Sequence, residues 1–484
     1  MSKFNKVSSG TRTKNLAGGD AFKISDELQF ATILLTSFVE AQFYSSENET
    51  IDKVANLITG FTDKQFAAKA SVYARNEYGM RSITHVAAAE IAKEVKGVQW
   101  TAKYFDMVIR RVDDITEILS YYLNKHGKPI PNALKKGLRS SFDKFDEYQL
   151  AKYRAEGKAF SLIDAVNLLH PIPTDKNGDA LKKLVKGELI SKDTWEVGQT
   201  QAGQKANTEE EKKALKKENW VHLVKSKKLG YFALLRNLRN ITAQAPEVLT
   251  EALDMLTDEK LISKSLVLPF RYYTAIRELE KASIDRKVIS ALSTALEKSV
   301  VNVPRFEGKT LIALDDSGSM TWGNNEQWGK PITIGSLFAA VLYKANPDSD
   351  FMKFSVDARY GTYNDMDATL TIQKQMMENL QGSGTNFHSI FTTANKKYDR
   401  VIILSDMQGW MGSGALASTF NTYKANYKAD PHVYSWDLQG YGTVQFPERQ
   451  VYMLAGFSEK VFDVMKLLET DKQALVNTIK AIKF

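Results

Sequence analysis

The stretch that decides the fold of the C-terminal part of the chain is LIALDDSGSM, residues 311–320. An apolar run suited to a buried strand ends at Leu314, and Asp315, Ser317 and Ser319 follow at alternate positions. In an open sheet of parallel strands, ligands bind at the carboxyl ends of the strands. A carboxylate and two hydroxyls at such an end are hard oxygen ligands of the kind that Mg²⁺ prefers. This stretch therefore predicts a strand followed by a divalent-cation site.

Further apolar runs after residue 310 are separated by helix-like segments. We expect strands at 351–356, 401–404, 432–436 and 451–455 and helices at 333–345, 387–398 and 415–427. Alternation of this kind predicts a doubly wound α/β domain, with a parallel sheet and helices on both faces. We expect the last helices, from about residue 459 to 483, to cover that sheet.

Two more residues fit the same metal site. Thr385 lies in a Gly-rich turn before a helix, and Asp406 directly follows the strand expected at 401–404. The predicted ligands of one divalent cation are Asp315, Ser317, Ser319, Thr385 and Asp406. Mg²⁺ is the favoured ion, and Mn²⁺ and Ca²⁺ are the alternatives. Asp and Ser are also common in turns and helix caps, so the placement of all five after strands and turns carries the argument.

Residues 21–300 have helical periodicity almost throughout. A long helix is expected from 101 to about 126, where Gly127 and the prolines beyond it end the pattern. Short joins between helices predict stacked helix pairs, a HEAT-like solenoid. Residues 1–20 are expected to be a flexible tail, 174–220 an irregular insertion, 301–309 a linker and 310–484 the α/β domain.

The positive charge of the chain lies entirely in its first part. Residues 301–484 carry 18 Lys and Arg against 19 Asp and Glu, so residues 1–300 carry the other 47 and 38, a net charge of +9. A basic domain beside a neutral one suggests a polyanionic partner for the basic one. The alternative is a helical domain whose lysines are only solvated.

Within the basic part, the densest mixture of cationic and aromatic side chains lies between residues 135 and 158. Cations neutralise phosphates, and aromatic rings stack on the bases of single strands. Arg236 and Arg239 lie three apart on a later helix, and His170 ends another. The alternative for each single residue is a core aromatic or a solvated cation. The candidate RNA-binding residues are Lys135, Lys136, Arg139, Lys144, Lys152, Arg154, Lys158, His170, Arg236 and Arg239.

Several function classes find no support in the sequence. There is no cysteine, and no apolar run approaches the roughly 20 residues that span a bilayer. Phosphate-binding loops, nucleophile elbows and His-Glu-x-x-His motifs are missing, and the six histidines are scattered. A hydroxyl-rich site for a single metal is poorly suited to hydrolysis. We therefore expect a cytoplasmic protein that is not an enzyme and does not bind membranes.

Two parts of the chain resemble known modules. The five predicted ligands match the metal-ion-dependent adhesion site of von Willebrand A domains, which binds a divalent ion and does not catalyse. The segments RNEYGMRSITHVAA (75–88), FDEYQLAKYR (145–154), ALLRNLRNIT (233–242) and LVLPFRYYTAIRELE (266–280) resemble the TROVE module of the Ro autoantigen family. Helices followed by an A domain is the order found in Ro proteins, here of bacterial or phage type.

The resemblance to Ro implies a helical ring closed by the A domain. It implies binding of Y-like RNA on a basic outer surface and of single-stranded 3′ ends of misfolded RNA in the central hole. The implied role is RNA quality control or scaffolding of a ribonucleoprotein, by a monomer that co-operates with an exoribonuclease. The family's His-Lys pair for Y RNA is replaced by Leu162 and Ile163 here, while His170 remains. The alternative function is a metal-dependent protein-interaction scaffold without RNA.

Overall fold

The computed structural model describes most of the chain. The described residues are 12–15, 17–23, 25–36, 47–153, 160–189, 208–282, 284–321, 331–412, 416–439, 443–444, 451–455, 462, 465 and 474–484. None of the helices in these ranges is long and apolar enough to cross a bilayer.

The first helical region follows a short hairpin of strands β1 (Arg12–Lys14) and β2 (Asp20–Lys23). Its helices are α1 (Asp26–Thr36), α2 (Glu47–Gly60), α3 (Lys64–Asn76), α4 (Ser82–Glu94), α5 (Thr101–Val108), α6 (Val112–His126), α7 (Asn132–Ser140), η1 (Ser141–Lys144), α8 (Glu147–Lys152), α9 (Leu162–Leu169) and α10 (Gly178–Val185). Local signals set several ends. The Asp63 carboxylate caps α3 by accepting a hydrogen bond from Gln65 N, and Gly127 ends α6 at a φ of 68°.

The second helical region has a separate apolar core. It consists of α12 (Glu209–Lys225), α13 (Tyr231–Gln244), η2 (Pro246–Val248), α14 (Leu249–Thr257), α15 (Glu259–Ser265), α16 (Pro269–Lys281), α17 (Arg286–Ser299) and η3 (Val300–Asn302). Buried residues from Trp220 to Leu296 pack together in this core. Thus α10 and α12 occupy part of the stretch 174–220, which the composition suggested was irregular.

The C-terminal domain contains a sheet with the order β5-β4-β3-β6-β7-β9. Its strands are β3 (Thr310–Asp315), β4 (Ser349–Phe354), β5 (Ala358–Gly361), β6 (Arg400–Ser405), β7 (His432–Asp437) and β9 (Val451–Ala455). All neighbours are parallel except β5, which pairs antiparallel with β4 at the edge. The prediction of a parallel sheet is confirmed, with β5 as an addition. Strand β8 (Thr443–Val444) pairs with β2 in a second sheet.

Helices cover both faces of the six-stranded sheet. On one face, buried side chains such as Leu311 and Ile403 pack against α21 (His388–Thr393) and α22 (Leu416–Tyr427). On the other, Ile312 and Leu404 share an apolar core with α19 (Pro331–Ala345), α20 (Thr369–Met376) and the first helical region. A short helix, α18 (Gly318–Thr321), follows β3. The sheet is therefore doubly wound, and one of its faces joins the helical part of the molecule.

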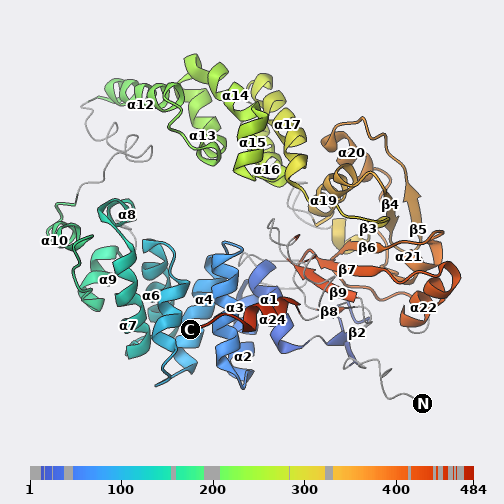
Figure 1. Cartoon of the computed structure of the whole chain (residues 1–484), viewed down its shortest axis with the longest axis horizontal. Helices are drawn as coiled ribbons and strands as arrows, with labels where there is room; N and C mark the ends of the chain where they lie inside the picture. Colours follow the sequence, from blue (N-terminus) through green and yellow to red (C-terminus); the bar gives the residue numbers. More distant parts are fainter. Residues whose placement is uncertain are drawn as a thin grey trace.

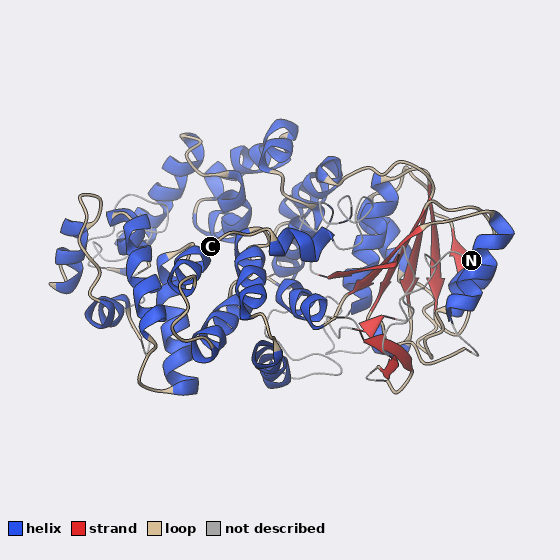
Figure 2. Ribbon diagram, turned by 60° about the horizontal axis from the view of Figure 1, so that its bottom comes forward, coloured by secondary structure: helices blue, strands red, loops and turns tan. Residues whose placement is uncertain are grey.

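The helices and the sheet are arranged in a ring. Figure 1 shows the first helices along one side, α12–α17 across the top, and the sheet domain closing the circle. Figure 2 shows the strands gathered at one end of the helical array. The closure is made by α24 (Ala474–Lys480), which packs on α3 and α1. Beyond it, the rings of Phe484 and Trp100 stack with centroids 5.5 Å apart.

Three further sequence expectations differ from the structure. Helix α24 packs on α3 and α1, although Phe462 and Met465 share the apolar core of the sheet as expected for this segment. The long helix expected from residue 101 is two helices, because the Asp114 carboxylate accepts hydrogen bonds from Arg110 N and Arg111 N and so starts α6 anew. Residues 12–14, placed in a flexible tail, form strand β1, which pairs with β2.

Candidate metal centre and nucleic-acid interface

The five predicted metal ligands lie at one rim of the sheet. Strands β3 and β6 are parallel neighbours, so Asp315 and Asp406 emerge side by side from their carboxyl ends. The loop carrying Thr385 is hydrogen-bonded to the segments that follow both strands. Gly318 N donates to Ser383 O, and both Trp410 N and Met411 N donate to Thr385 O. Ser317 and Ser319 have their hydroxyl oxygens 3.4 Å apart. The structure therefore brings together all five residues.

Both carboxylates of this rim are buried. Asp315 accepts hydrogen bonds from Ser317 N at 2.9 Å and from Ser405 Oγ at 2.5 Å. Burial and the negative charge of Asp406 raise the pKa of Asp315 to about 7. Burial also raises the pKa of Asp406. Two buried acids without a cation partner repel one another, and a divalent ion between them would relieve that repulsion.

One atom of the rim tests whether the residues fit a metal. Asp406 Oδ2 is buried and has no hydrogen-bond partner, while Asp406 Oδ1 accepts from Gln408 N at 3.2 Å. A buried carboxylate oxygen without a partner is costly. The nearby hydroxyls of Ser317, Ser319 and Thr385 supply further hard oxygen atoms. The donor set and the unsatisfied oxygen fit a small divalent cation.

Asp316 has a structural role that the sequence did not reveal. Its side chain is fully buried and forms an ion pair with Arg359 of the edge strand β5. Its carboxylate accepts from Gln381 N at 3.1 Å, and its carbonyl oxygen accepts from Gly382 N at 2.9 Å. Asp316 thereby fastens the loop that leads to Thr385. No local pattern signals this role, because both partners are more than 40 residues away.

Trp410 stands exposed beside the metal-site rim. Its side chain is 57% exposed, while its ring atom Cζ2 lies so close to Gly384 that a Cβ there would be 2.7 Å away. No Lys or Arg occurs in residues 310–329, 375–395 or 401–423, which include the three loops of the site. These three stretches therefore offer an apolar ring and hydroxyl groups, and carry no Lys or Arg of their own to attract a phosphate backbone.

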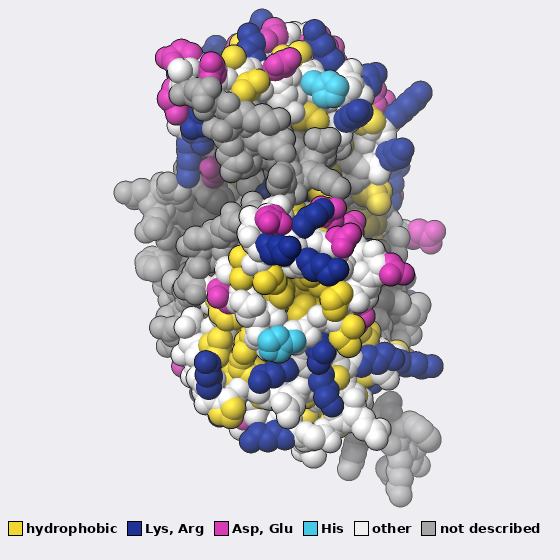
Figure 3. Space-filling model, turned by 90° about the vertical axis from the view of Figure 1, so that its left-hand side faces the viewer, with side chains coloured by type: hydrophobic (Ala, Val, Ile, Leu, Met, Phe, Trp, Pro, Cys, Tyr) yellow, Lys and Arg dark blue, Asp and Glu magenta, His cyan; other side chains and the backbone are white. Residues whose placement is uncertain are grey.

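The predicted RNA-binding residues of α7 lie on the surface. Leu134, Gly137 and Leu138 face the core, which leaves Lys136 and Arg139 exposed and Lys135 partly exposed. His170 is also exposed, at the left-handed C-cap of α9. Figure 3 shows that the lower part of the face bearing α7, α9 and α10 carries many Lys and Arg side chains around a histidine, and few acidic ones.

Other predicted members of this patch are placed differently. The Lys144 ammonium lies 3.0 Å from Asp106 Oδ1 and donates to Ile109 O, so it links two segments of the fold. Lys152 lies over the rings of Tyr148 and Tyr153. Phe142 and Phe145 of the same stretch are core residues. Arg154 and Lys158 lie outside the described residues.

Arg236 and Arg239 are exposed on α13, away from α7 along the ring. The Arg236 guanidinium lies 6.0 Å from the centre of the Phe232 ring, and Arg271 of α16 lies at the same distance. Phe232 is 44% exposed. In Figure 1 both helices lie on the side of their arc that faces the middle of the ring. Sequence reasoning missed Phe232 and Arg271, whose association depends on the packing of two helices.

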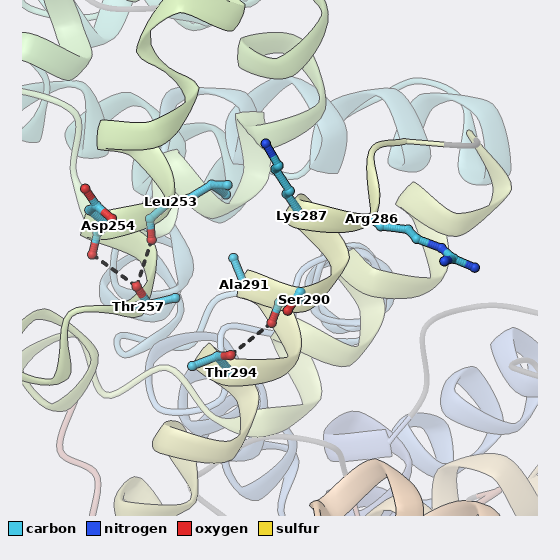
Figure 4. Close-up of a pocket in the computed structure, with 8 residues that line it drawn as sticks. All are labelled: Leu253, Asp254, Thr257, Arg286, Lys287, Ser290, Ala291 and Thr294. Atoms are coloured by element: carbon cyan, nitrogen blue, oxygen red, sulfur yellow. Dashed lines mark hydrogen bonds between the residues drawn. The ribbon is translucent and has the colours of Figure 1, made fainter.

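A shallow pocket of about 460 Å³ lies between α14 and α17, and Figure 4 shows its lining. The hydroxyls of Thr257 and Thr294 donate to carbonyls of their own helices. Arg286 points away from the pocket in this view. None of the predicted site residues lines it.

Comparisons with known proteins extend across the chain. The TROVE domain model matches residues 17–218 and 206–315, and the Ro60 vWA domain model matches residues 309–468. Telomerase protein component 1 of Rattus norvegicus is 24% identical over 301 residues, which is 45% of this chain and 11% of that protein. The Mus musculus protein of the same name is 24% identical over 297 residues, with the same coverage. The chain thus spans about a tenth of the length of these relatives.

The fold also has a solved counterpart. The crystal structure of the Deinococcus radiodurans Ro (RSR) protein matches with a TM-score of 0.65 and 18% identity, over 90% of this chain and 99% of that one. This likeness shows that the helical ring and sheet domain follow the architecture of a Ro protein. The family models cover the helical part and the sheet domain in the same order. The chain therefore belongs to the TROVE family of RNA-binding proteins and has the Ro arrangement, a helical module followed by a vWA domain.

Proposed function

We propose that this protein binds small non-coding RNA on the exposed surface of α7 and α9 and admits single-stranded 3′ ends into the middle of the ring. It acts without catalysis, in RNA quality control or as the scaffold of a ribonucleoprotein. The observation that carries the proposal is the cationic face of α7, formed by Lys135, Lys136 and Arg139 within a basic, largely helical region. Such a face binds phosphates and releases their counterions.

Single strands need a second kind of contact, and α13 and α16 offer one. Phe232 presents an exposed ring flanked by two guanidinium groups, Arg236 and Arg271. Bases stack on aromatic rings and guanidinium planes with little regard to sequence. We assign the capture of single-stranded ends to this region and structured RNA to α7. An exoribonuclease that receives the captured end is the proposed protein partner, and the ring acts as a monomer.

In this proposal the vWA domain binds a metal ion. Asp315, Ser317, Ser319, Thr385 and Asp406 would hold one divalent cation, Mg²⁺ by preference, directly or through water. The ion would neutralise the two buried carboxylates and present an open coordination position to a ligand. The chain's own residues fix the loops, and in this proposal both carboxylates serve to bind the ion and take no part in proton transfer.

A binding titration tests the leading proposal. Purified protein is titrated with one structured RNA, with and without a single-stranded 3′ tail, at two salt concentrations. Tighter binding of the tailed RNA, falling steeply with salt, is the expected result. No binding of either RNA at low salt would refute the proposal.

A second candidate function is a protein-interaction scaffold that works through the metal centre. It is favoured by the exposed Trp410 and by the lack of cations in the three loops of the rim. Tryptophan is enriched among the residues that dominate protein interfaces. A partner protein held through the ion would be released by a chelator and would not be displaced by RNA, so the two functions can be separated in one competition experiment.

A further inference from the structure

The N-terminal hairpin reaches the loop that carries Asp406. Within the hairpin, Asn15 N donates to Gly19 O at 2.9 Å, and Gly19 N donates to Asn15 Oδ1 at 2.8 Å. The remaining group of this side chain, Asn15 Nδ2, donates to Gly409 O at 2.6 Å, across 394 residues of sequence. Asn15 is buried, although all three residues of β1, the strand that precedes it, are exposed. The turn is therefore built around a contact with the loop 406–411.

Gly19 makes the same contact from the other side of the turn. A Cβ at this position would lie 2.2 Å from Gly409 O and 2.7 Å from Trp410 Cα. Both atoms belong to backbone, so they cannot move aside as the end of a flexible side chain would. Only glycine allows the hairpin and the loop to approach this closely.

The loop 406–411 is also hydrogen-bonded to Thr385, another predicted ligand of the metal. Trp410 N and Met411 N donate to Thr385 O, at 3.2 and 3.1 Å. The segment that follows Asp406 is thus held between Thr385 on one side and Asn15 on the other. Because Gly409 is three residues from Asp406, displacement of the loop would move a predicted ligand.

We infer that the N-terminal hairpin is part of the support of the metal centre, with Asn15 and Gly19 as positioning residues for the loop 406–411. The inference rests on the proposed metal site. Residues that orient the ligands of a metal change its affinity by roughly 10- to 100-fold when they are removed. Coupling between two sites is reciprocal, so a bound cation also stabilises the docked hairpin. The hairpin leads through β2 into α1. Metal binding is therefore expected to stabilise the packing of the hairpin and of α1 against the sheet domain.

Titration of the full chain with Mg²⁺ and with Mn²⁺ by calorimetry tests the first half of the inference. Asn15→Ala removes the hydrogen bond to Gly409, and Gly19→Ala forces the turn away from the loop. Each is expected to weaken cation binding by about tenfold or more. The matched control is Lys14→Ala with Asp20→Ala, which removes an exposed ion pair of the same hairpin and should leave the affinity unchanged. RNA binding and the circular dichroism spectrum of the metal-free protein should stay the same in Asn15→Ala, which a general loss of structure would not allow.

Limited digestion with trypsin tests the second half without substitutions in the hairpin. Cleavage after the exposed Arg12 and Lys14 should slow when Mg²⁺ is added to the wild-type protein, and should not slow in Asp315→Ala. If the wild-type protein binds neither cation, the proposed metal site fails and the inference fails with it. If the wild-type protein binds a cation and Asn15→Ala binds it equally well, only the inference is overturned.

Discussion

Arg75 and Asp114 form a buried ion pair, with Nη2 and Oδ2 2.8 Å apart, which joins α3 to the first turn of α6. His85 of α4 approaches the other oxygen of the same carboxylate at 2.9 Å. Burial alone would raise the pKa of Asp114, but the His85 hydrogen bond and the charges of His85 and Arg75 outweigh it and hold the pKa well below its usual range. Arg75 thus has a structural role in the fold.

Asp114→Ala is expected to destabilise the protein by about 3–5 kcal/mol, because it leaves the Arg75 guanidinium buried without its partner. It also removes the acceptor for Arg110 N and Arg111 N at the start of α6. Denaturant unfolding measures the change. Asp179→Ala, which removes an exposed carboxylate of α10, is the control and should change the stability by less than about 0.5 kcal/mol. Equal stability of the two variants would contradict this account.

The contribution of Asp114 to the free energy of unfolding should decrease as the pH falls into the acid range. Because the folded-state pKa is depressed, the contribution is complete above the unfolded pKa of about 3.9 and is lost as the pH falls below it, towards the folded value. The slope of stability against pH in acid should therefore be smaller in Asp114→Ala than in the wild type. Identical slopes would show that Asp114 does not carry the proton linkage.

Charge reversal on α7 tests the proposed RNA surface. The triple variant Lys135→Glu, Lys136→Glu, Arg139→Glu should weaken binding of structured RNA, with the wild-type circular dichroism spectrum retained. If all three contact phosphate, the slope of log K against log salt should fall by about 3, close to one unit for each contact. The control is Lys260→Glu, Lys264→Glu, Lys287→Glu on α15 and α17, which changes the net charge equally. Equal losses in both triples would mean that only the overall charge matters.

Gly137 makes the geometry of α7 sensitive to a single methyl group. A Cβ there would lie 2.4 Å from Phe105 Cβ and 2.5 Å from Ala102 O. Gly137→Ala should therefore destabilise the protein by about 1–3 kcal/mol. Gly60→Ala, where a Cβ would meet nothing within 4 Å, is the control and should be neutral or slightly stabilising. Thermal unfolding of both variants decides the matter.

Asp315→Ala should abolish binding of divalent cations and leave RNA affinity unchanged. The variant removes one of the two buried carboxylates of the rim, while α7 and α13 lie elsewhere in the ring. Asp357→Ala, an exposed carboxylate after β4, is the matched control. Titration with Mn²⁺ and a gel shift with RNA are the two measurements. Loss of both activities in Asp315→Ala would show that the metal centre and the RNA surface are coupled.

The features that sequence reasoning predicted are those carried by local pattern. Each predicted strand of the main sheet (β3, β4, β6, β7 and β9) contains apolar or aromatic residues, and a polar or small residue lies at or directly after its carboxyl end. The five metal-site residues could be grouped because parallel strands place their ends on one edge. Phe142 and Phe145 show the limit of such reasoning, since an aromatic beside lysines reads equally as a stacking residue or as core.

What the sequence did not predict depends on contacts between distant residues. Asp316 meets Arg359, and Asn15 meets Gly409, and neither pair leaves a periodic or local signal. The break between α5 and α6 depends on the Asp114 carboxylate, whose capping role is hidden within a continuous helical pattern. Asp316 and Asn15 satisfy backbone groups of a distant segment, which only the folded structure reveals, whereas Asp114 satisfies backbone groups of its own helix start.

The apolar cores do not follow the boundary between the helical part and the vWA domain. One core runs from the first helices through α24 and across one face of the sheet, whereas residues from Trp220 to Leu296 form a core of their own. Cooperative unfolding units follow shared burial rather than position along the chain. The first helices and the sheet should therefore unfold together, and α12–α17 should unfold as a separate unit. Such partial unfolding would open the ring at α12–α17 while the first helices, α24 and the sheet stay folded.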